Sequence, residues 1–193
     1  MNETAKVAPR RGVPLWAQIV IWALLVGLLV LVAFELNRSQ QGQVQPGASI
    51  QNFTMPLFSG YELNGQNQFN LSAYRGKVVM VNFWASWCKP CEQEAADLEQ
   101  AWQYYKDSGK VVFVGADYVD TEPEARAYLQ KFGITFANGP DLGTKVSQLF
   151  RIKGVPETYF IDQNGVLKYA QIGPFSSVDE IKAIIDPLLK QQQ

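Results

Sequence analysis

The longest apolar stretch of the chain lies near its start. From residue 13 to residue 34 no position is charged, and of these 22 positions only Pro14, Gln18 and Gly27 fall outside the strongly apolar set. At ~1.5 Å of rise per residue such a helix reaches about 33 Å, which is enough to cross a bilayer core of roughly 30 Å. The pattern therefore predicts a transmembrane helix over residues 13–35, preceded by a short N-terminal segment, residues 1–12.

A cleaved signal peptide is the alternative interpretation of this stretch. Its apolar length exceeds the usual signal core, and residues 31–37 offer no cleavage site of the small-x-small kind. Lys6, Arg10 and Arg11 precede the stretch, whereas only Arg38 lies close behind it. By the positive-inside rule the N-terminus stays in the cytoplasm and the rest of the chain lies outside. We therefore expect an uncleaved, single-pass anchor in the cell membrane.

After the anchor the hydrophobic pattern changes twice. Residues 36–49 are rich in Gln, Ser and Gly and carry few apolar side chains, which predicts a flexible linker. Residues 50–193 alternate between apolar and polar stretches and are long enough for one compact domain with its own core. We expect this domain to be extracytoplasmic.

Within the domain, apolar runs alternate with stretches of helical spacing. Residues 78–84 and 111–116 are apolar at nearly every position, as is typical of strands covered on both faces. Helical spacing follows each run, over residues 90–106 and 122–132. The alternation predicts a βαβ unit with parallel strands.

The C-terminal part has a different pattern. Residues 155–162 read as a strand opened by a proline, residues 166–172 as the returning antiparallel strand, and residues 178–189 as an amphipathic helix. Residues 132–150 are expected to form a connecting loop. Two short strands are predicted before the βαβ unit, at residues 53–57 and 68–71.

The chain's two cysteines lie directly after the first core strand, in the sequence Trp87-Cys88-Lys89-Pro90-Cys91. If the strand ends in a short turn and a helix begins here, Cys88 lies near the helix N-terminus. Unpaired backbone N–H groups and the helix dipole stabilise a thiolate at this position. We therefore assign Cys88 as the nucleophile. Cys91, about one helical turn further on, is the resolving thiol that attacks a mixed disulfide formed at Cys88.

The sequence argues against several other uses of these cysteines. Structural zinc needs four ligands, and the chain has no other cysteine and no histidine. Covalent haem needs a histidine directly after the second cysteine, where this chain has Glu92. A purely structural disulfide would close a very small loop and constrain the unfolded chain little. The net charge of −1, without a basic stripe, argues against nucleic acid as a partner.

Two segments resemble a known family. Residues 81–91 are similar to the active-site signature of the thioredoxin superfamily, and residues 154–162 are similar to its cis-proline segment. The anchor, Asn82 and Glu94 narrow the resemblance to the TlpA/ResA-like branch of membrane-anchored thiol-disulfide oxidoreductases. The resemblance covers about residues 50–189. It implies an α/β, thioredoxin-like fold, in which helices flank a central mixed β-sheet.

The resemblance also implies a substrate-binding surface around the dithiol. Pro156, if cis, would lie beside the Cys88 sulfur and leave the Val155 backbone free to pair with a substrate segment as an added strand. The alternative is a proline that simply begins an edge strand. Trp87 would line the same surface, although a tryptophan at this position could also belong to the core.

Glu94 is the candidate for tuning the thiols. Thioredoxins usually carry a buried aspartate where this chain has Asn82, so the acid–base group that serves Cys91 must be another residue or water. Glu94 lies three residues past Cys91 and matches a glutamate that tunes thiol acidity in the ResA-like branch. The alternative is an ordinary solvated helix residue. Ala95-Ala96 replace a proline that is frequent in the branch, so a straighter helix is expected.

The expected function is reduction of protein disulfides outside the cytoplasm, with no cofactor beyond the Cys88–Cys91 pair. By resemblance the substrate is the Cys-x-x-Cys-His segment of apocytochrome c, and the electron donor is a membrane thiol transporter of the CcdA/DsbD type. The main alternative is a thiol oxidase that inserts disulfides. A thiol peroxidase, which needs a Pro-x-x-x-Thr-x-x-Cys setting that this chain lacks, and a non-catalytic tethered binding module are further alternatives.

Overall fold

The structure, a computed structural model, describes residues 14–39 and 42–190, which fall into two compact units. The first contains one helix, α1 (Leu15–Ser39). Its segment Leu15–Phe34 buries none of its apolar side chains within the structure, and it is long and apolar enough to cross a membrane. The helix begins close to where the sequence predicts it. The predicted N-terminal segment, residues 1–12, lies outside the described residues.

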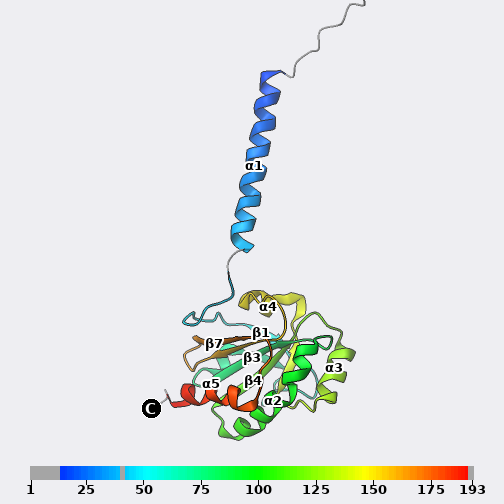
Figure 1. The fold of residues 1–193 in the computed structure, drawn as a ribbon, viewed down its shortest axis with the longest axis vertical. Coiled ribbons are helices and arrows are strands. Elements are labelled where there is room, and N and C mark those ends of the chain that lie inside the picture. Colours follow the sequence, from blue (N-terminus) through cyan, green and yellow to red (C-terminus); the bar gives the residue numbers. More distant parts are fainter. Residues whose placement is uncertain (1–13, 40–41, 191–193) are drawn as a thin grey trace, which may run out of the picture. The chain divides into compact units, whose positions relative to one another are not determined.

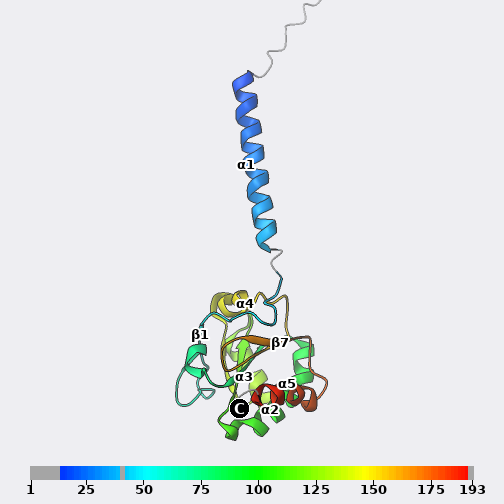
Figure 2. The same ribbon diagram turned by 90° about the vertical axis from the view of Figure 1, so that its left-hand side faces the viewer.

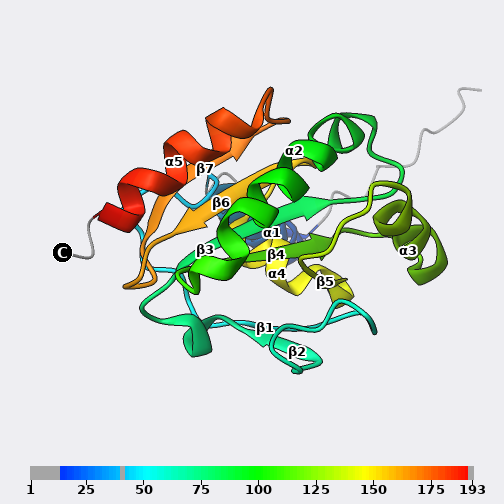
Figure 3. The ribbon, with the colours of Figure 1, turned by 90° about the horizontal axis from the view of Figure 1, so that it is seen from below.

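The second unit, which begins at Gln43, contains a mixed β-sheet with helices on its faces (Figure 1). Over the part of the chain that the structure describes, the central sheet has five strands in the order β5-β4-β3-β6-β7 (Figure 3). Strands β3, β4 and β5 are parallel, β6 is antiparallel to β3, and β7 is antiparallel to β6. Strands β1 and β2 form a separate antiparallel pair. The elements are β1 (Thr54–Pro56), β2 (Gln68–Asn70), η1 (Leu71–Tyr74), β3 (Val78–Trp84), α2 (Lys89–Tyr105), η2 (Lys106–Ser108), β4 (Val111–Asp117), α3 (Glu122–Lys131), β5 (Ala137–Pro140), η3 (Leu142–Thr144), α4 (Lys145–Phe150), β6 (Glu157–Ile161), β7 (Leu167–Ile172) and α5 (Val178–Lys190).

Strand β3 is buried at every residue because its two faces belong to two different cores. Val78 and Met80 pack with side chains of α2, α3 and α5, whereas Val79, Val81 and Phe83 pack with side chains of β1, β2 and α4. Figures 1 and 2 show α4 on one side of the sheet and α2 and α5 on the other. The predicted α/β fold with a central mixed sheet flanked by helices is confirmed, and β3 has the predicted bounds.

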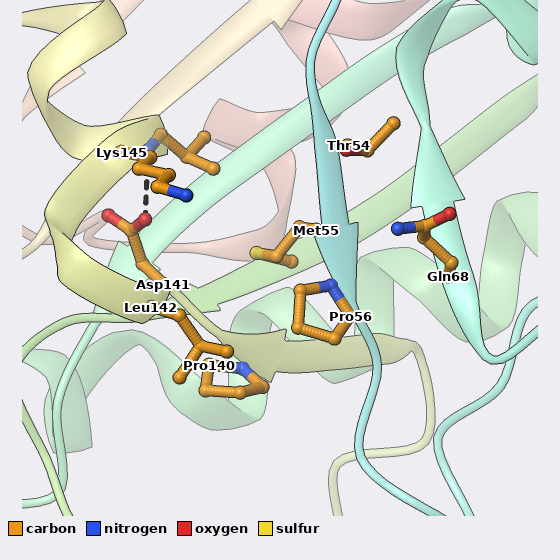
Figure 4. A pocket seen from close by; sticks show the side chains of 9 residues that line it. Thr54, Met55, Pro56, Gln68, Pro140, Asp141, Leu142 and Lys145 are labelled. Carbon is orange, nitrogen blue, oxygen red and sulfur yellow. Dashed lines mark hydrogen bonds between the residues drawn. The ribbon is translucent and has the colours of Figure 1, made fainter.

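Residues 132–150, expected to be a loop, contain an edge strand and a short helix. Strand β5 has a weak sequence signal because Gly139 and Pro140 are poor strand formers. Its position depends on contacts with distant residues. Gly139 packs so closely against the backbone of β1 that a Cβ at this position would lie 1.9 Å from the backbone oxygen of Pro56. The Asp141 carboxylate accepts hydrogen bonds from the backbone N–H groups of Val146 and Ser147, both 2.8 Å, at the start of α4. Figure 4 shows the Asp141 carboxylate directed at the start of this helix.

Both ends of the predicted linker, residues 36–49, belong to other parts of the structure. Helix α1 continues to Ser39, and residues 43–49 belong to the domain. The Gly47 N–H donates to Leu167 O at 2.7 Å, and the Leu167 N–H donates to Ala48 O at 2.9 Å. These bonds join the segment to β7 through backbone atoms and need no apolar side chains, so hydrophobic patterning did not detect them.

A buried hydrogen bond across strands β3, β4 and β5 depends on Gly115. Trp84 Nε1 donates to Asn138 Oδ1 at 2.9 Å, and Gly115 lies opposite Asn138 in the β4–β5 register. A Cβ at Gly115 would lie 1.8 Å from that oxygen and 2.8 Å from the indole nitrogen.

We expect Gly115→Ala to lower the free energy of unfolding by about 2–4 kcal/mol, because it overpacks the core and breaks this bond. Chemical denaturation would measure the change. Gly154→Ala is the control, since a Cβ at Gly154 meets nothing within 4 Å and should change stability by no more than about 0.5 kcal/mol. Equal stability of the two variants would contradict the prediction.

Candidate active site

Cys88 and Cys91 form a disulfide at the junction of β3 and α2. The S–S distance is 2.03 Å and the two Cα atoms lie 5.3 Å apart. Cys88 is the N-cap residue of α2, and its Sγ accepts a hydrogen bond from the Cys91 N–H at 3.1 Å, while Pro90 stands in the first helical turn. The same position would direct unpaired N–H groups and the helix dipole at a Cys88 thiolate once the bond is reduced.

The surroundings of the disulfide are unevenly exposed. The cysteines are nearly buried, Cys88 at 3 % exposure and Cys91 at 1 %, whereas Trp87 is 57 % exposed. Trp87 is therefore a surface residue beside the dithiol and not part of the core. Its role in substrate binding stays a prediction.

Pro156 follows a cis peptide bond with Val155. Strand β6, which begins one residue later, lies between β3 and β7, so Pro156 does not open an edge strand. Val155, Pro156 and Pro90 line one hollow on the surface. The cis-proline segment and the first turn of α2 thus lie next to each other.

Glu94 is fully buried, which rules out the solvated alternative. Its Oε1 accepts a hydrogen bond from Asn82 Nδ2 at 2.9 Å, and its Oε2 accepts one from the Phe175 N–H at 3.0 Å. Asn82 Nδ2 also donates to Thr158 Oγ1 at 2.9 Å. Burial raises the pKa of Glu94 from its ordinary value of 4.5 to about 7, and the two hydrogen bonds oppose the rise.

The Glu94 carboxyl therefore titrates close to neutral pH, one helical turn from Cys91. Helix α2 runs without interruption from Lys89 to Tyr105 through Ala95-Ala96, as expected for a chain without the proline. The carboxyl has the proton affinity that a group serving Cys91 needs.

Tyr128 of α3 is a contact of the site that the sequence did not reveal. Its hydroxyl donates to the Cys91 carbonyl oxygen at 2.9 Å, and its ring stacks on Trp84 with centroids 4.5 Å apart. Burial and the nearby Glu94 raise the pKa of Tyr128, so the hydroxyl remains a proton donor. It fixes the first turn of α2 against α3.

Comparison with known proteins identifies the family to which this chain belongs. The model of the AhpC/TSA family matches residues 46–170. The chain belongs to the AhpC/TSA family. Among curated relatives, it is similar to the thiol-disulfide oxidoreductase ResA of Geobacillus kaustophilus, with 28% identity over 160 residues, covering 81% of this chain and 88% of ResA. It is also similar to the thiol:disulfide interchange protein DsbE of Allochromatium vinosum, with 33% identity over 135 residues, covering 67% of this chain and 72% of DsbE.

A solved structure supports the same assignment. A putative thiol:disulfide interchange protein DsbE from Chlorobium tepidum is 25% identical, covers 78% of this chain and 99% of its own, and superposes with a TM-score of 0.65. This AhpC/TSA family member is thus a thiol-disulfide oxidoreductase of the ResA/DsbE type with a thioredoxin-like fold. The resemblance noted in the sequence is confirmed.

In this oxidoreductase a buried glutamate that sequence reasoning missed shapes the cis-proline segment. Glu157 Oε1 accepts hydrogen bonds from the N–H groups of Lys153 at 2.9 Å and Gly154 at 3.3 Å. Its Oε2 accepts one from the Tyr159 hydroxyl at 2.6 Å. The carboxylate thus holds the backbone just before Pro156. In the sequence, only the position of Glu157 directly after Pro156 could have indicated this role.

The turn after β4 is a further neighbour of the active site that the sequence did not reveal. Trp87 Nε1 donates to Val119 O at 3.1 Å, and the Ser86 N–H donates to Asp120 Oδ2 at 2.6 Å. Burial, then the adjacent Asp120, raises the pKa of Asp117 to about 8. These contacts fasten residues 117–120 of the oxidoreductase to the segment that leads into Cys88.

Proposed function

We propose that α1 anchors this oxidoreductase in the cell membrane with its domain outside the cytoplasm, where it reduces disulfides of client proteins. The proposed client is apocytochrome c before haem attachment, at its Cys-x-x-Cys-His segment. One observation carries the proposal: the Cys88–Cys91 pair caps a helix beside a cis-proline segment. The ResA and DsbE relatives and the apolar helix support it further.

The reaction begins with the reduced protein, whereas the structure contains the oxidised form. The Cys88 thiolate attacks one sulfur of the client disulfide, and the other client sulfur leaves as a thiolate that takes up a proton. Cys91 then loses its proton and attacks Cys88 Sγ, which releases the second client thiol. Two electrons pass from the dithiol to the client, whose two protons come from Cys91 and from the solvent, and the Cys88–Cys91 bond forms.

Glu94 is the group proposed to receive the Cys91 proton. It lies one turn from Cys91 along α2, and its pKa of about 7 lets it accept a proton from a thiol and return it. Val155 is proposed to pair with the extended client backbone beside Pro156, and Trp87 to line the same surface. Val155 lines a hollow together with Pro90, which lies between the two cysteines in the chain, and Trp87 directly precedes Cys88.

Regeneration of the dithiol needs a reductant, because the environment outside the cytoplasm favours disulfides. We propose a membrane thiol transporter of the CcdA/DsbD type, which would carry two electrons across the bilayer for each client reduced.

The redox potential distinguishes this function from that of a thiol oxidase. Equilibration of the Cys88–Cys91 couple with defined glutathione or dithiothreitol buffers should give a potential near that of thioredoxin, about −270 mV. A potential close to about −120 mV, the value of a strong oxidant, would overturn the reductase proposal in favour of disulfide insertion.

The anchor is tested by fractionation. We expect the full chain to sediment with membranes, to keep residues 1–42 by mass spectrometry, and to lose its domain to protease added outside spheroplasts. A chain that lacks residues 1–42 should be soluble, because the apolar helix is gone. Recovery of a mature protein that begins after residue 34 would favour the cleaved signal peptide instead.

The family name makes peroxide a natural second substrate to test. In the peroxidase setting a proline precedes the reactive cysteine by seven positions and a threonine by three, where this chain has Val81 and Ala85. We therefore expect the reduced full chain to consume hydrogen peroxide no faster than free dithiothreitol does.

A further inference from the structure

In the segment that contains α4, the exposed charges are all positive. Residues 141–172 include three acidic side chains, and none of them is more than 5 % exposed. They are Asp141, Glu157 and Asp162. Each accepts hydrogen bonds from backbone N–H groups close to it in the chain. At the surface of this segment only Lys168 has an acidic partner, Asp162, at 3.2 Å.

Three other cations of the segment are exposed, namely Lys145, Arg151 and Lys153. None of them forms an ion pair with another residue that the structure describes. Lys145 begins α4 (Figure 4), and Arg151 directly follows its last residue. Together with the exposed Gln148 they recur at every third residue along the side of α4 that faces away from the core. Lys145, Arg151 and Lys153 form the basic surface of the domain.

Arg151 occupies a position at which glycine is the preferred residue. It is the C-cap of α4 and its φ is 55°, in the left-handed region, where a Cβ is unfavourable. Capping of the helix uses the backbone N–H of Arg151, which donates to Gln148 O at 3.2 Å. A glycine would keep this bond, so arginine contributes its exposed positive charge and not a better helix end.

The opposite side of the sheet has a different distribution of charge. Helices α2, α3 and α5 share one core there and carry exposed or half-exposed side chains of both signs. The acidic ones are Glu92, Asp97, Glu99, Glu122, Glu124, Asp179, Glu180 and Asp186. Since the net charge of the chain is −1, the basic surface results from segregation of charge and not from a basic composition. An anionic partner would therefore be attracted to the α4 side of the domain.

Only a short stretch of chain separates the end of α1 from the neighbour of this surface. Helix α1 ends at Ser39, and the Val44 N–H donates to the backbone oxygen of Phe150, the last residue of α4, at 3.4 Å. Fully extended, the chain from Ser39 to Val44 spans at most about 18 Å. A bilayer that holds α1 is therefore within reach of the basic surface.

We propose that the basic surface binds the head groups of anionic phospholipids and so holds the domain against the membrane. The inference rests on the proposed function, because it takes α1 to be a membrane anchor. Each basic side chain near an anionic lipid surface strengthens binding about fivefold. Lys153 also lines the hollow beside Pro156. Docking thus keeps that hollow near the head groups and raises its effective concentration for the membrane thiol transporter.

The test uses the full chain with its disulfide intact, reconstituted in lipid nanodiscs. A cysteine introduced by Gln148→Cys is labelled with a fluorophore while Cys88 and Cys91 are blocked by their bond. The discs contain phosphatidylcholine alone or a mixture with about one third phosphatidylglycerol. In both, some phosphatidylcholine carries a nitroxide quencher on its head group. A label introduced by Gln100→Cys, at an exposed position of α2, reports on the opposite side of the sheet.

We expect the label at position 148 to be quenched strongly in anionic discs and weakly in neutral ones, and the label at position 100 to be quenched weakly in both. Salt at about 0.5 M should abolish the difference, because it screens the charges. Lys145→Gln combined with Arg151→Gly should lower the ratio of docked to undocked domain about 25-fold, since two basic side chains are lost. Arg151→Gly alone should unfold at or above the wild-type temperature, which separates a lost charge from a lost fold.

Lys106→Gln combined with Lys110→Gln is the matched control, because it removes two exposed cations outside the basic surface. It should leave the docking ratio within about twofold of wild type. Equal quenching at position 148 in neutral and anionic discs would overturn this inference alone and would leave the basic surface to an acidic protein partner. An equal effect of the control would overturn it too, because net charge would then account for the binding. A full chain that does not co-purify with the discs would overturn the proposed anchor and this inference with it.

Discussion

Cys88→Ser is expected to lower the rate of disulfide reduction by at least about 10³-fold, because the variant has no sulfur at the helix N-terminus to attack the client. Cys91→Ser should behave differently. It keeps the Cys88 thiolate, so the first step proceeds, but nothing displaces the client. A covalent complex should therefore accumulate, one client for each protein, and mass spectrometry should locate the bond at Cys88.

The two variants control for each other, since each removes the same disulfide. Loss of a crosslink that closes so short a loop costs about 2 kcal/mol in either variant, and their unfolding temperatures should agree. Any difference in reactivity then reflects the separate roles of the two sulfurs. Accumulation of the complex with Cys88→Ser and not with Cys91→Ser would show that the nucleophile had been assigned to the wrong cysteine. In cells, the trapped partner would identify the client.

The sequence predicted the elements whose pattern is local. Strand β3 is apolar at every residue except Asn82 because both of its faces are buried, and the Trp87-Cys88-Lys89-Pro90-Cys91 segment follows soon after it in the chain. These two signals were sufficient to predict the central strand, the cap position of Cys88 and the fold class. Helix α2 and the β6–β7 hairpin were also predicted to within a few residues.

What the sequence missed is defined by distant contacts. Strand β5 consists of Ala137-Asn138-Gly139-Pro140, and its pairing with β4 is what makes it a strand. Glu94 accepts a hydrogen bond from Phe175, which lies 81 residues away in the chain. The Val119 carbonyl oxygen accepts a hydrogen bond from the Trp87 indole across 32 residues of the chain. No periodicity encodes such pairs, so they emerge only in three dimensions.

Glu94→Gln is expected to remove the pH dependence of the second chemical step. In wild type, resolution of the mixed disulfide by Cys91 should accelerate up to about pH 7 and level off above it, since only the ionised Glu94 accepts the thiol proton. The variant should lack this inflection and be slower by about 10²-fold at pH 8. Rapid-quench measurement of the mixed disulfide at a series of pH values would test this. A wild-type profile with no inflection between pH 6 and 8 would contradict it.

Glu92→Gln is the matched control, because Glu92 lies on the same turn of α2 but pairs with Lys89 and Lys131 at the surface. Its pKa is lowered, chiefly by the hydrogen bond from Lys89. It is therefore ionised well below neutral pH, and its loss should leave the inflection near pH 7 in place. If the pH profile of Glu92→Gln also lacked the inflection near pH 7, the inflection would reflect the overall charge of this helical turn and not the titration of Glu94.

Stability supplies an independent measurement of the same carboxyl. The folded protein holds the Glu94 proton up to about pH 7, whereas the unfolded chain releases it near 4.5, so its contribution to stability falls as the pH rises between these values. At ~1.4 kcal/mol for each pH unit the full change is about 3 kcal/mol. Asp117, whose pKa is raised to about 8, adds a similar decline, but it is present in wild type and variant alike and cancels in their difference. Denaturation at pH 5 and pH 8 should therefore show Glu94→Gln gaining about 2–3 kcal/mol relative to wild type, because the unfolded chain has already released part of the proton at pH 5. An unchanged difference would mean that Glu94 titrates at its ordinary value and cannot serve Cys91 near neutral pH.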